Sequence, residues 1–457
     1  MGKNFNRFVK VITVEPAYFF YWSTYVIADS AYTNLLLQKK CRVSTLAEPD
    51  LNTPCDDEKQ GVVFATEMNS FYRMVMLLLA LIVAIFMSSW SDEAGKRRRP
   101  LIFLPIIGLI FQSIFGCLHS YFWSWIPTSA VLLNSIPEVI TGGISMMIMA
   151  TQIYICDVSS LENCTLRMGI LLATRTLADL FGCGSSGFIL HSFGFFYTYL
   201  LCFVLSVISL ILACIFVKDV SVPVSKKSNF IKSFNVTKIV DSFKVVFSKK
   251  LGKNRIVVVM LMITYTLVFF TTQGEKGILY LFLRHKFHWN EREYSIYVLY
   301  RYTGVIVGNL FCSVVMSKLL KLHDGMIGII AGIFDTIAAF GYLFASQDWH
   351  LYVVPLFDVF HGAALTVCIC FLSKYYESHE IGRLTSVLGV FALINPSCHP
   401  TYNGIFEYAL DVFPSAHFLL SVSLDLIIVL LYCASYSFSQ KFKISKSFTK
   451  EEIKIIH

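Results

Sequence analysis

The stretch Asp92-Glu93-Ala94-Gly95-Lys96-Arg97-Arg98-Arg99-Pro100 decides how this chain is interpreted. It joins two long apolar segments, and its chemistry suits a short turn at a membrane surface. Gly95 permits a tight turn, and Asp92 can cap or pair with a neighbouring helix end. The cations from Lys96 to Arg99 hold such a loop on the cytoplasmic face, where short loops accumulate Lys and Arg. A cluster that only sets membrane topology is the alternative.

Composition agrees with a membrane protein. The chain has 457 residues, of which 56% are hydrophobic and 15% are charged, and its mean hydropathy is +0.63. A soluble domain carries about 25% charged residues and could not bury this much apolar surface. Repeated apolar stretches of ~20 residues exclude disordered chains, disulfide frameworks, soluble enzymes and nucleic-acid binders.

Hydropathy predicts twelve spanning helices in two groups of six. The predicted spans lie near 15–37, 68–90, 101–121, 131–156, 167–190, 195–217, 256–283, 294–317, 325–345, 351–375, 382–408 and 413–436. The first is the least apolar, because Glu15, Asp29 and several Tyr and Ser residues dilute it. We therefore expect an all-α membrane protein with twelve transmembrane helices in two six-helix bundles.

The distribution of cations predicts that both termini are cytoplasmic. Residues 218–255 hold ten Lys and Arg against two acids, whereas the loop 38–67 holds four against six acids. Lys and Arg favour the cytoplasmic side, and an even number of spans agrees with this orientation. The expected parts are an N-terminal bundle (1–217), a basic cytoplasmic linker with an amphipathic helix (218–255), and a C-terminal bundle with a cytoplasmic tail (256–457).

Cys41 and Cys55 both fall in the first outward loop, so a disulfide between them is predicted, with free thiols as the alternative. The sequence contains no phosphate loop, zinc-ligand set or nucleophile elbow. We therefore expect no metal, no cofactor and no enzyme activity, and an ATP-driven pump is disfavoured.

The loop between the second and third spans resembles the loop signature of the major facilitator superfamily. In that signature an Asp, a Gly and two basic residues hold the two halves in the outward-facing state. Ser88 stands where the signature usually has a leading Gly. The resemblance implies a twelve-helix fold of two halves. It assigns a conformational role to Asp92, Gly95, Lys96, Arg97 and Arg98.

Further stretches narrow the resemblance. They are Ser89-Trp90-Ser91-Asp92, Asp157-Val158-Ser159-Ser160 with Arg167-Met168, Ile405-Phe406, Phe413-Pro414 and Phe418-Leu419-Leu420. As a set they are similar to the proton-coupled folate transporter family, solute carrier family 46, over nearly the whole length. The resemblance implies secondary transport of organic anions, commonly driven by protons, across the plasma or lysosomal membrane.

Three functional charges of the vertebrate folate carriers are replaced here. Leu172 stands at their acidic residue of span 5, Phe269 at their span 7 histidine, and Ile369 or Cys370 near their span 10 arginine. Folate is therefore a doubtful substrate, and that proton-coupling scheme cannot be carried over.

Charged residues within the spans are the candidates for function, because each costs at least ~2.5–3.5 kcal/mol at mid-membrane. Asp29 in span 1 either lines a cavity or pairs with another helix. Arg175 and Asp179 in span 5 are four residues apart, which favours an intrahelical ion pair. Alternatively, Arg175 meets a carboxylate of the substrate.

Glu275 in span 7 follows a Gly that lets the helix unwind, and it is the first candidate for a protonatable group. An exposed residue at the helix end is its alternative. Arg301 in span 8 lies between two Tyr residues. It either binds an anion through its guanidinium fork or pairs with Asp335 of span 9.

Asp358 and His361 in span 10 are three residues apart on one helix face. A carboxylate beside an imidazole can share a proton near physiological pH, although a buried His is more often a core residue. Asp425 in span 12 is expected only to pack.

We expect a secondary transporter that alternates between inward-open and outward-open states and carries a small organic anion with protons. A carrier of peptidoglycan fragments or other catabolites is one alternative, and a receptor-like member that moves no solute is another. The plasma membrane is favoured over the lysosomal membrane. We expect a monomer surrounded by lipid, with no nucleic-acid partner.

Overall fold

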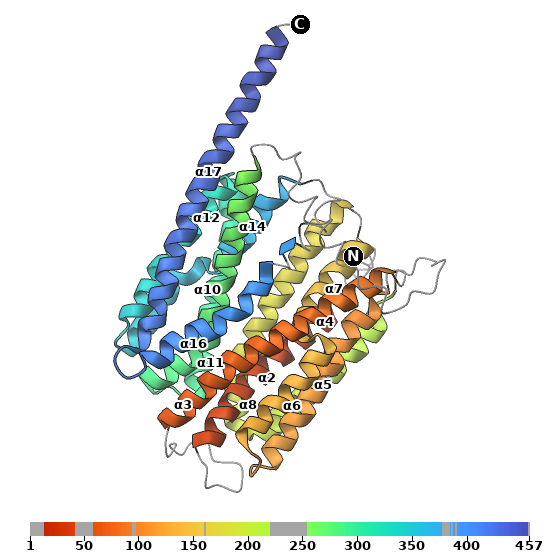
Figure 1. The fold of residues 1–457 in the computed structure, drawn as a ribbon, viewed down its shortest axis with the longest axis vertical. Helices are drawn as coiled ribbons and strands as arrows, with labels where there is room; N and C mark the ends of the chain where they lie inside the picture. Colours follow the sequence, from red (N-terminus) through yellow and green to blue (C-terminus); the bar gives the residue numbers. More distant parts are fainter. Residues whose placement is uncertain are drawn as a thin grey trace, which may run out of the picture. The chain divides into compact units, whose positions relative to one another are not determined.

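The computed structural model describes residues 13–41, 58–93, 97–159, 161–219, 254–376, 384, 387–388 and 391–455. Within these residues every regular element is helical (Figure 1). The chain divides into two compact units, Met1–Asn235 with Tyr280–Tyr302 and Val236–Leu279 with Thr303–His457. Most of the predicted linker at 218–255 lies outside the described residues, so the proposed three-part division stays a prediction.

The first unit is built from long apolar helices. They are α2 (Glu15–Cys41), α3 (Glu58–Glu67), a π-helical turn (Met68–Tyr72), α4 (Arg73–Glu93), α5 (Arg99–Tyr121), α6 (Pro127–Thr141), α7 (Gly143–Val158) and α8 (Leu161–Phe216). α2 and α5 both pack along α8. Pro100 and Pro127 lie in the first turns of α5 and α6, where a missing N–H leaves no helical hydrogen bond unmade.

Gly194 separates two predicted spans within α8. Its backbone angles, φ 76° and ψ −178°, are not helical, and a side chain would disfavour them. The 56-residue helix is therefore kinked between the predicted spans 167–190 and 195–217.

The second unit contains both long helices and short helical pieces. Two of its helices are divided between the units: α10 (Arg255–Phe287) belongs to the second unit up to Leu279, and α11 (Glu291–Phe311) from Thr303 onwards. The other elements are a π-helical segment (Cys312–Leu319), α12 (Asp324–Phe344), α13 (Asp348–Val353), 3₁₀ turns at Val354–Leu356 and Asp358–Phe360, α14 (Ala363–Ser373), a 3₁₀ segment (Ala392–Ser397), α16 (Cys398–Tyr408), a 3₁₀ turn (Pro414–Ala416) and α17 (His417–Ile455). α12 packs against α14 and α17. Apolar side chains of α10, α12, α14 and α17 form the core of this unit.

All twelve predicted spans fall on helical segments, although 382–408 is described only in part. By length and composition, eight helical stretches of the described residues are apolar enough to cross a membrane. One of them, Ala173–Phe216, covers most of two predicted spans. α2 is not among the eight, which agrees with its polar composition. The arrangement is consistent with twelve spans.

Small residues let α8 approach α11 closely within the first unit. A Cβ atom on Gly187 would lie 1.9 Å from the carbonyl oxygen of Glu291. The Gly187 N–H donates to Ser295 Oγ (2.8 Å), and this hydroxyl donates to the carbonyl of Cys183 (3.1 Å). Because the nearest atom belongs to the backbone, it cannot move aside like a flexible side chain.

Replacing Gly187 with Ala should therefore destabilise the protein. Overpacking of this kind costs about 1–3 kcal/mol, which exceeds the ~1 kcal/mol that Ala gains in helix propensity. The thermal unfolding midpoint of the purified chain in detergent measures the effect. Gly404→Ala is the matched control, since a Cβ atom there meets no atom within 4 Å. A Gly187→Ala midpoint at or above that of wild type would contradict the close contact.

Candidate functional site

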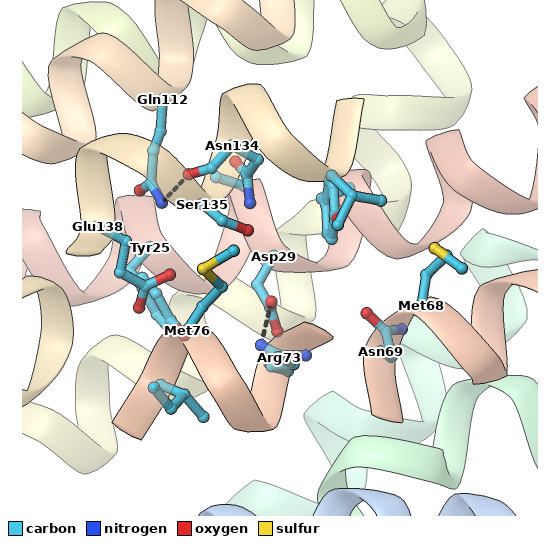
Figure 2. A pocket seen from close by; sticks show the side chains of 14 residues that line it. Tyr25, Asp29, Met68, Asn69, Arg73, Met76, Gln112, Asn134, Ser135 and Glu138 are labelled. Atoms are coloured by element: carbon cyan, nitrogen blue, oxygen red, sulfur yellow. Dashed lines mark hydrogen bonds and ion pairs between the residues drawn. The ribbon is translucent and has the colours of Figure 1, made fainter. Parts of the chain in front are cut away.

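The first unit contains a pocket with polar and apolar walls, which Figure 2 shows. Its empty volume is about 530 Å³, part of which is open to solvent. The lining comes from α2, the π-helical turn, α4, α5 and α6. The polar lining residues are Tyr25, Asp29, Tyr32, Asn69, Arg73, Gln112, Asn134, Ser135 and Glu138.

An ion pair joins α2 to the start of α4 in this pocket. The Arg73 guanidinium donates a hydrogen bond to the Asp29 carboxylate (Figure 2). The Arg73 side chain is 20% exposed and that of Asp29 is 36% exposed, so both reach the open part of the pocket. Asp29 thus lines a cavity and pairs with another helix, and its role in transport stays a prediction.

Arg73 and Glu138 are site residues that the sequence prediction missed. They lie inside the predicted spans 68–90 and 131–156. The energetic cost of intramembrane charge, which singled out Asp29, applies to both of them equally. That criterion would have found them if it had been applied to every span.

Gly143, just after the end of α6, leaves room for the side chain of Glu138. Gly142 ends the helix in a left-handed conformation with φ 71°. A Cβ atom on Gly143 would lie 2.4 Å from Cγ of Glu138. Gln112 lies beside Glu138, and its amide nitrogen donates to the carbonyl of Asn134 (2.8 Å). The backbone of this region therefore fixes the carboxyl group against the pocket.

The second unit contains a pocket that gathers four carboxyl groups and an imidazole. Glu275 comes from α10, Asp335 from α12 and Asp425 from α17. Asp358 begins the 3₁₀ turn before α14, and His361 directly follows that turn. Glu275 is 8% exposed, Asp358 2% and Asp425 6%. Three of these acids are therefore withdrawn from solvent, and all four face one small space.

His361 lies between two of the acids. Its Nδ1 atom is 3.3 Å from Oδ1 of Asp358 and 3.9 Å from Oδ1 of Asp335. Asp358 begins a 3₁₀ turn and His361 follows it, which differs from the regular helix that was predicted. Residues i and i+3 eclipse in a 3₁₀ turn, so the two side chains are brought to the same side.

Asp335, Asp358 and His361 also fit the ligand set of a metal ion. One ligand atom from each lies within 4.8 Å of the other two. Carboxylate and imidazole are common ligands of divalent transition metals. The sequence predicted no metal site, and this spacing only shows that the geometry permits one.

The placement of Asp425 differs from the expectation that it only packs. It lines the same pocket as Asp335, because α17 packs along α12. The neighbour of α17 decides this placement, and no pattern within span 12 indicates it.

Arg175, Asp179 and Arg301 line neither of the two pockets described here. The Arg175 guanidinium lies over the ring of Trp22 in α2, 4.2 Å from the ring centroid, which is a cation–π contact. Asp179 is buried in the same helix. Arg301 is half-buried in the first unit, whereas its predicted partner Asp335 belongs to the second and lies beside His361.

Arg98 of the signature loop is buried and bonds to residues of two neighbouring helices. Its side chain is 3% exposed, and Nε donates to Asp157 Oδ2 at 2.8 Å. Its Nη1 donates to Ser91 Oγ at 2.9 Å, so the residue joins α4, α5 and α7. Arg97 is exposed. Gly95, Lys96 and the side chain of Asp92 lie outside the described residues, and their conformational role stays a prediction.

A second arginine joins other stretches that carried the family resemblance. Arg167 donates to Glu15 at 3.0 Å, to Thr13 at 2.5 Å and to Ser159 at 3.3 Å. Both members of the Arg167–Glu15 pair are about 95% buried. Stretches that are far apart in the sequence thus meet in two neighbouring networks of the first unit.

Cys41, at the end of α2, is disulfide-bonded. Cys55 lies outside the described residues, so its pairing with Cys41 stays a prediction.

A family profile and two similar relatives point to the same protein family. Residues 65–395 match the sequence profile of the Major Facilitator Superfamily. The "Lysosomal proton-coupled steroid conjugate and bile acid symporter SLC46A3" of Gallus gallus is 25% identical over 449 residues, covering 93% of this chain and 94% of the relative. The "Probable peptidoglycan muropeptide transporter SLC46" of Drosophila melanogaster is 21% identical over 378 residues, covering 78% and 70%.

Solved structures show the same fold. The human organic anion transporter MFSD10 has a TM-score of 0.63 at 13% identity, covering 92% of this chain and 98% of its own. A D-xylose-proton symporter has a TM-score of 0.63 at 15% identity, covering 94% and 97%. These similarities confirm the predicted fold class and carry no information on the substrate.

The Arg98–Asp157 ion pair should stabilise the folded chain, because each buried charge compensates the other. Removing either partner leaves a buried charge uncompensated, which costs about 3–5 kcal/mol. We expect Arg98→Ala and Asp157→Ala each to lower the thermal unfolding midpoint strongly, and the double variant to lose much less than the sum of the two. Arg97→Ala is the neighbouring control and should change little. Additive effects of the two single variants would contradict a direct pair.

Proposed function

This chain belongs to the major facilitator superfamily, and we propose that it is a secondary active transporter that moves a small organic anion together with protons. Family membership makes it a multi-pass membrane transporter of the solute carrier 46 type rather than an enzyme. The proposal adds the charge of the solute and the coupling ion.

The acidic pocket of the second unit carries the proposal of proton coupling. Four carboxyl groups within one pocket repel one another when ionised, and burial further disfavours their charged forms. His361, 3.3 Å from Asp358, offers a second type of proton acceptor. Protons taken up by Glu275 or by the Asp358–His361 pair would remove this repulsion and favour the loaded form.

Arginines of the first unit support an anionic solute. Arg73 lines the pocket and uses only some of its guanidinium N–H groups to bond Asp29. Arg175 and Arg301 are two further candidates for binding an anion. A guanidinium binds a carboxylate or sulfate in two parallel hydrogen bonds. The names of the relatives, which refer to steroid conjugates and bile acids, also favour an amphipathic organic anion. Folate receives no such support.

A carrier of muropeptides is the second candidate, because the relative from Drosophila melanogaster has that name. A receptor-like protein that moves no solute is the third. Uptake of taurocholate, folate and a muropeptide by cells expressing the chain, in acidic and neutral medium, separates the three. Taurocholate uptake supports the first, muropeptide uptake the second, and no flux of any compound the third.

Glu275→Gln should abolish the acid stimulation of uptake. The amide is similar in size but cannot take up a proton, so the ratio of acidic to neutral taurocholate uptake should fall to about one. Asp358→Asn should have the same effect in the same assay. Asp348→Asn, which changes an exposed acid of the same unit, is the matched control and should keep the wild-type ratio. Full acid stimulation in both pocket variants would reject this proton site.

An acidic organelle is the proposed location, in place of the plasma membrane that the sequence favoured. Proton-coupled import into the cytosol needs an acidic compartment on the far side, and several relatives are called lysosomal. A fluorescently tagged full-length chain should coincide with a lysosomal marker in microscopy. Its two termini should be accessible to antibodies after permeabilisation of the plasma membrane alone. Labelling confined to the cell surface would restore the original expectation.

A further inference from the structure

Glu138 has a position that neither the fold nor the proposed proton site explains. Its carboxyl group lies on the wall of the pocket in the first unit (Figure 2). The Oε1 atom is shielded from solvent and accepts no hydrogen bond from the described residues. Within those residues Glu138 forms no direct ion pair with a Lys, Arg or His. The side-chain amide of Gln112 hydrogen-bonds to its carboxyl group, and the charge of Arg73 acts on it without a direct contact. A shielded carboxylate without a paired cation is costly, unless it takes up a proton or something that enters the pocket supplies a positive charge.

The only cation among the lining residues of this pocket is already engaged. Arg73 donates to Asp29, on the neighbouring helix α2. The lining therefore holds two carboxyl groups, Asp29 and Glu138, against one guanidinium. When all three are ionised, the pocket has one negative charge in excess, which an entering positive charge would neutralise.

The walls of the pocket suit an organic cation. Tyr25 and Tyr32 of α2 line it, and aromatic rings attract cations through their faces. Met68 and Met76 add flexible, polarisable side chains that adapt to different shapes. In Figure 2, Glu138 and Tyr25 lie on one side of the Asp29–Arg73 pair and Met68 on the other. A rotation about the last side-chain bond of Glu138 would exchange its two oxygens, so either oxygen can be turned toward a ligand in the pocket.

We propose that this pocket binds the ammonium group of the solute, with Glu138 as the acceptor and with the tyrosine rings beside it. The inference rests on the proposed function and refines it: among organic acids, those that also carry an amine should bind most tightly. Arg73 bonds to Asp29 and Tyr25, and its remaining guanidinium donors can bind the acid group of the same solute.

The test is direct binding to the purified full-length chain in detergent, with no membrane and no proton gradient. The probes are tyramine and N-acetyltyramine, which share the phenol ring and differ in whether the nitrogen is charged. Thermal unfolding over a range of ligand concentrations gives the apparent affinity, because a ligand that binds only the folded chain stabilises it. We expect tyramine to bind at least about tenfold more tightly than N-acetyltyramine.

Glu138→Gln should remove this preference while leaving the weak binding of N-acetyltyramine unchanged. Glu67→Gln is the matched control, since Glu67 is exposed at the end of α3, and it should behave as wild type. If Glu138→Gln does not fold, Glu138→Asp keeps the charge and should retain part of the preference. Equal affinities of wild type for the two probes, or a preference that survives Glu138→Gln, would overturn the proposal.

The outcome is independent of proton coupling. A preference for tyramine together with unchanged acid stimulation in Glu275→Gln would uphold the ammonium site and reject the proton site. Acid-stimulated taurocholate uptake without any tyramine preference would uphold proton coupling and reject the ammonium site. Glu138 would then hold only a proton.

Discussion

The cost of an ionic side chain in hydrocarbon is the constraint on which this structure depends. Each such group must have a partner, a proton or an aqueous space. Among the described residues, ion pairs and a pocket that is partly open to solvent are seen. Arg73 meets Asp29, Arg98 meets Asp157, and Arg167 meets Glu15. The intramembrane charges are therefore gathered into a few places, and those places are the candidates for transport.

The two units satisfy this constraint in different ways. In the first unit, arginines pair with acids, and the pocket contains the Arg73–Asp29 pair beside Glu138, whose carboxyl group forms no direct ion pair among the described residues. In the second unit, acids are collected around a single imidazole. The first arrangement suits recognition of a charged solute, and the second suits protons. This difference gives each unit a separate part in the proposed transport.

The stretches that resemble the solute carrier family are explained by the contacts they make. Asp157 and Ser91 hold the buried guanidinium of Arg98, while Ser159 contributes to the network of Arg167. These contacts join α4, α5, α7 and α8, and Arg167 also reaches α2, so the similar stretches of the first unit mark positions where helices contact one another. The two pockets, which are the proposed solute and proton sites, are lined by residues outside these stretches.

The sequence by itself determined the helices, because a long apolar stretch can satisfy its backbone in a bilayer only as a helix or a closed barrel. It also predicted Glu275, Asp358 and His361 as possible proton sites, since a charge within a span is visible without a structure. Only the tertiary structure decided which charges share a space. Asp425 joins Asp335 because α17 packs along α12, and Glu138 shares a pocket with the Asp29–Arg73 pair because α6 packs against α4. Helices that are far apart in the chain decide by their packing which side chains become neighbours. No local sequence pattern predicts such neighbours.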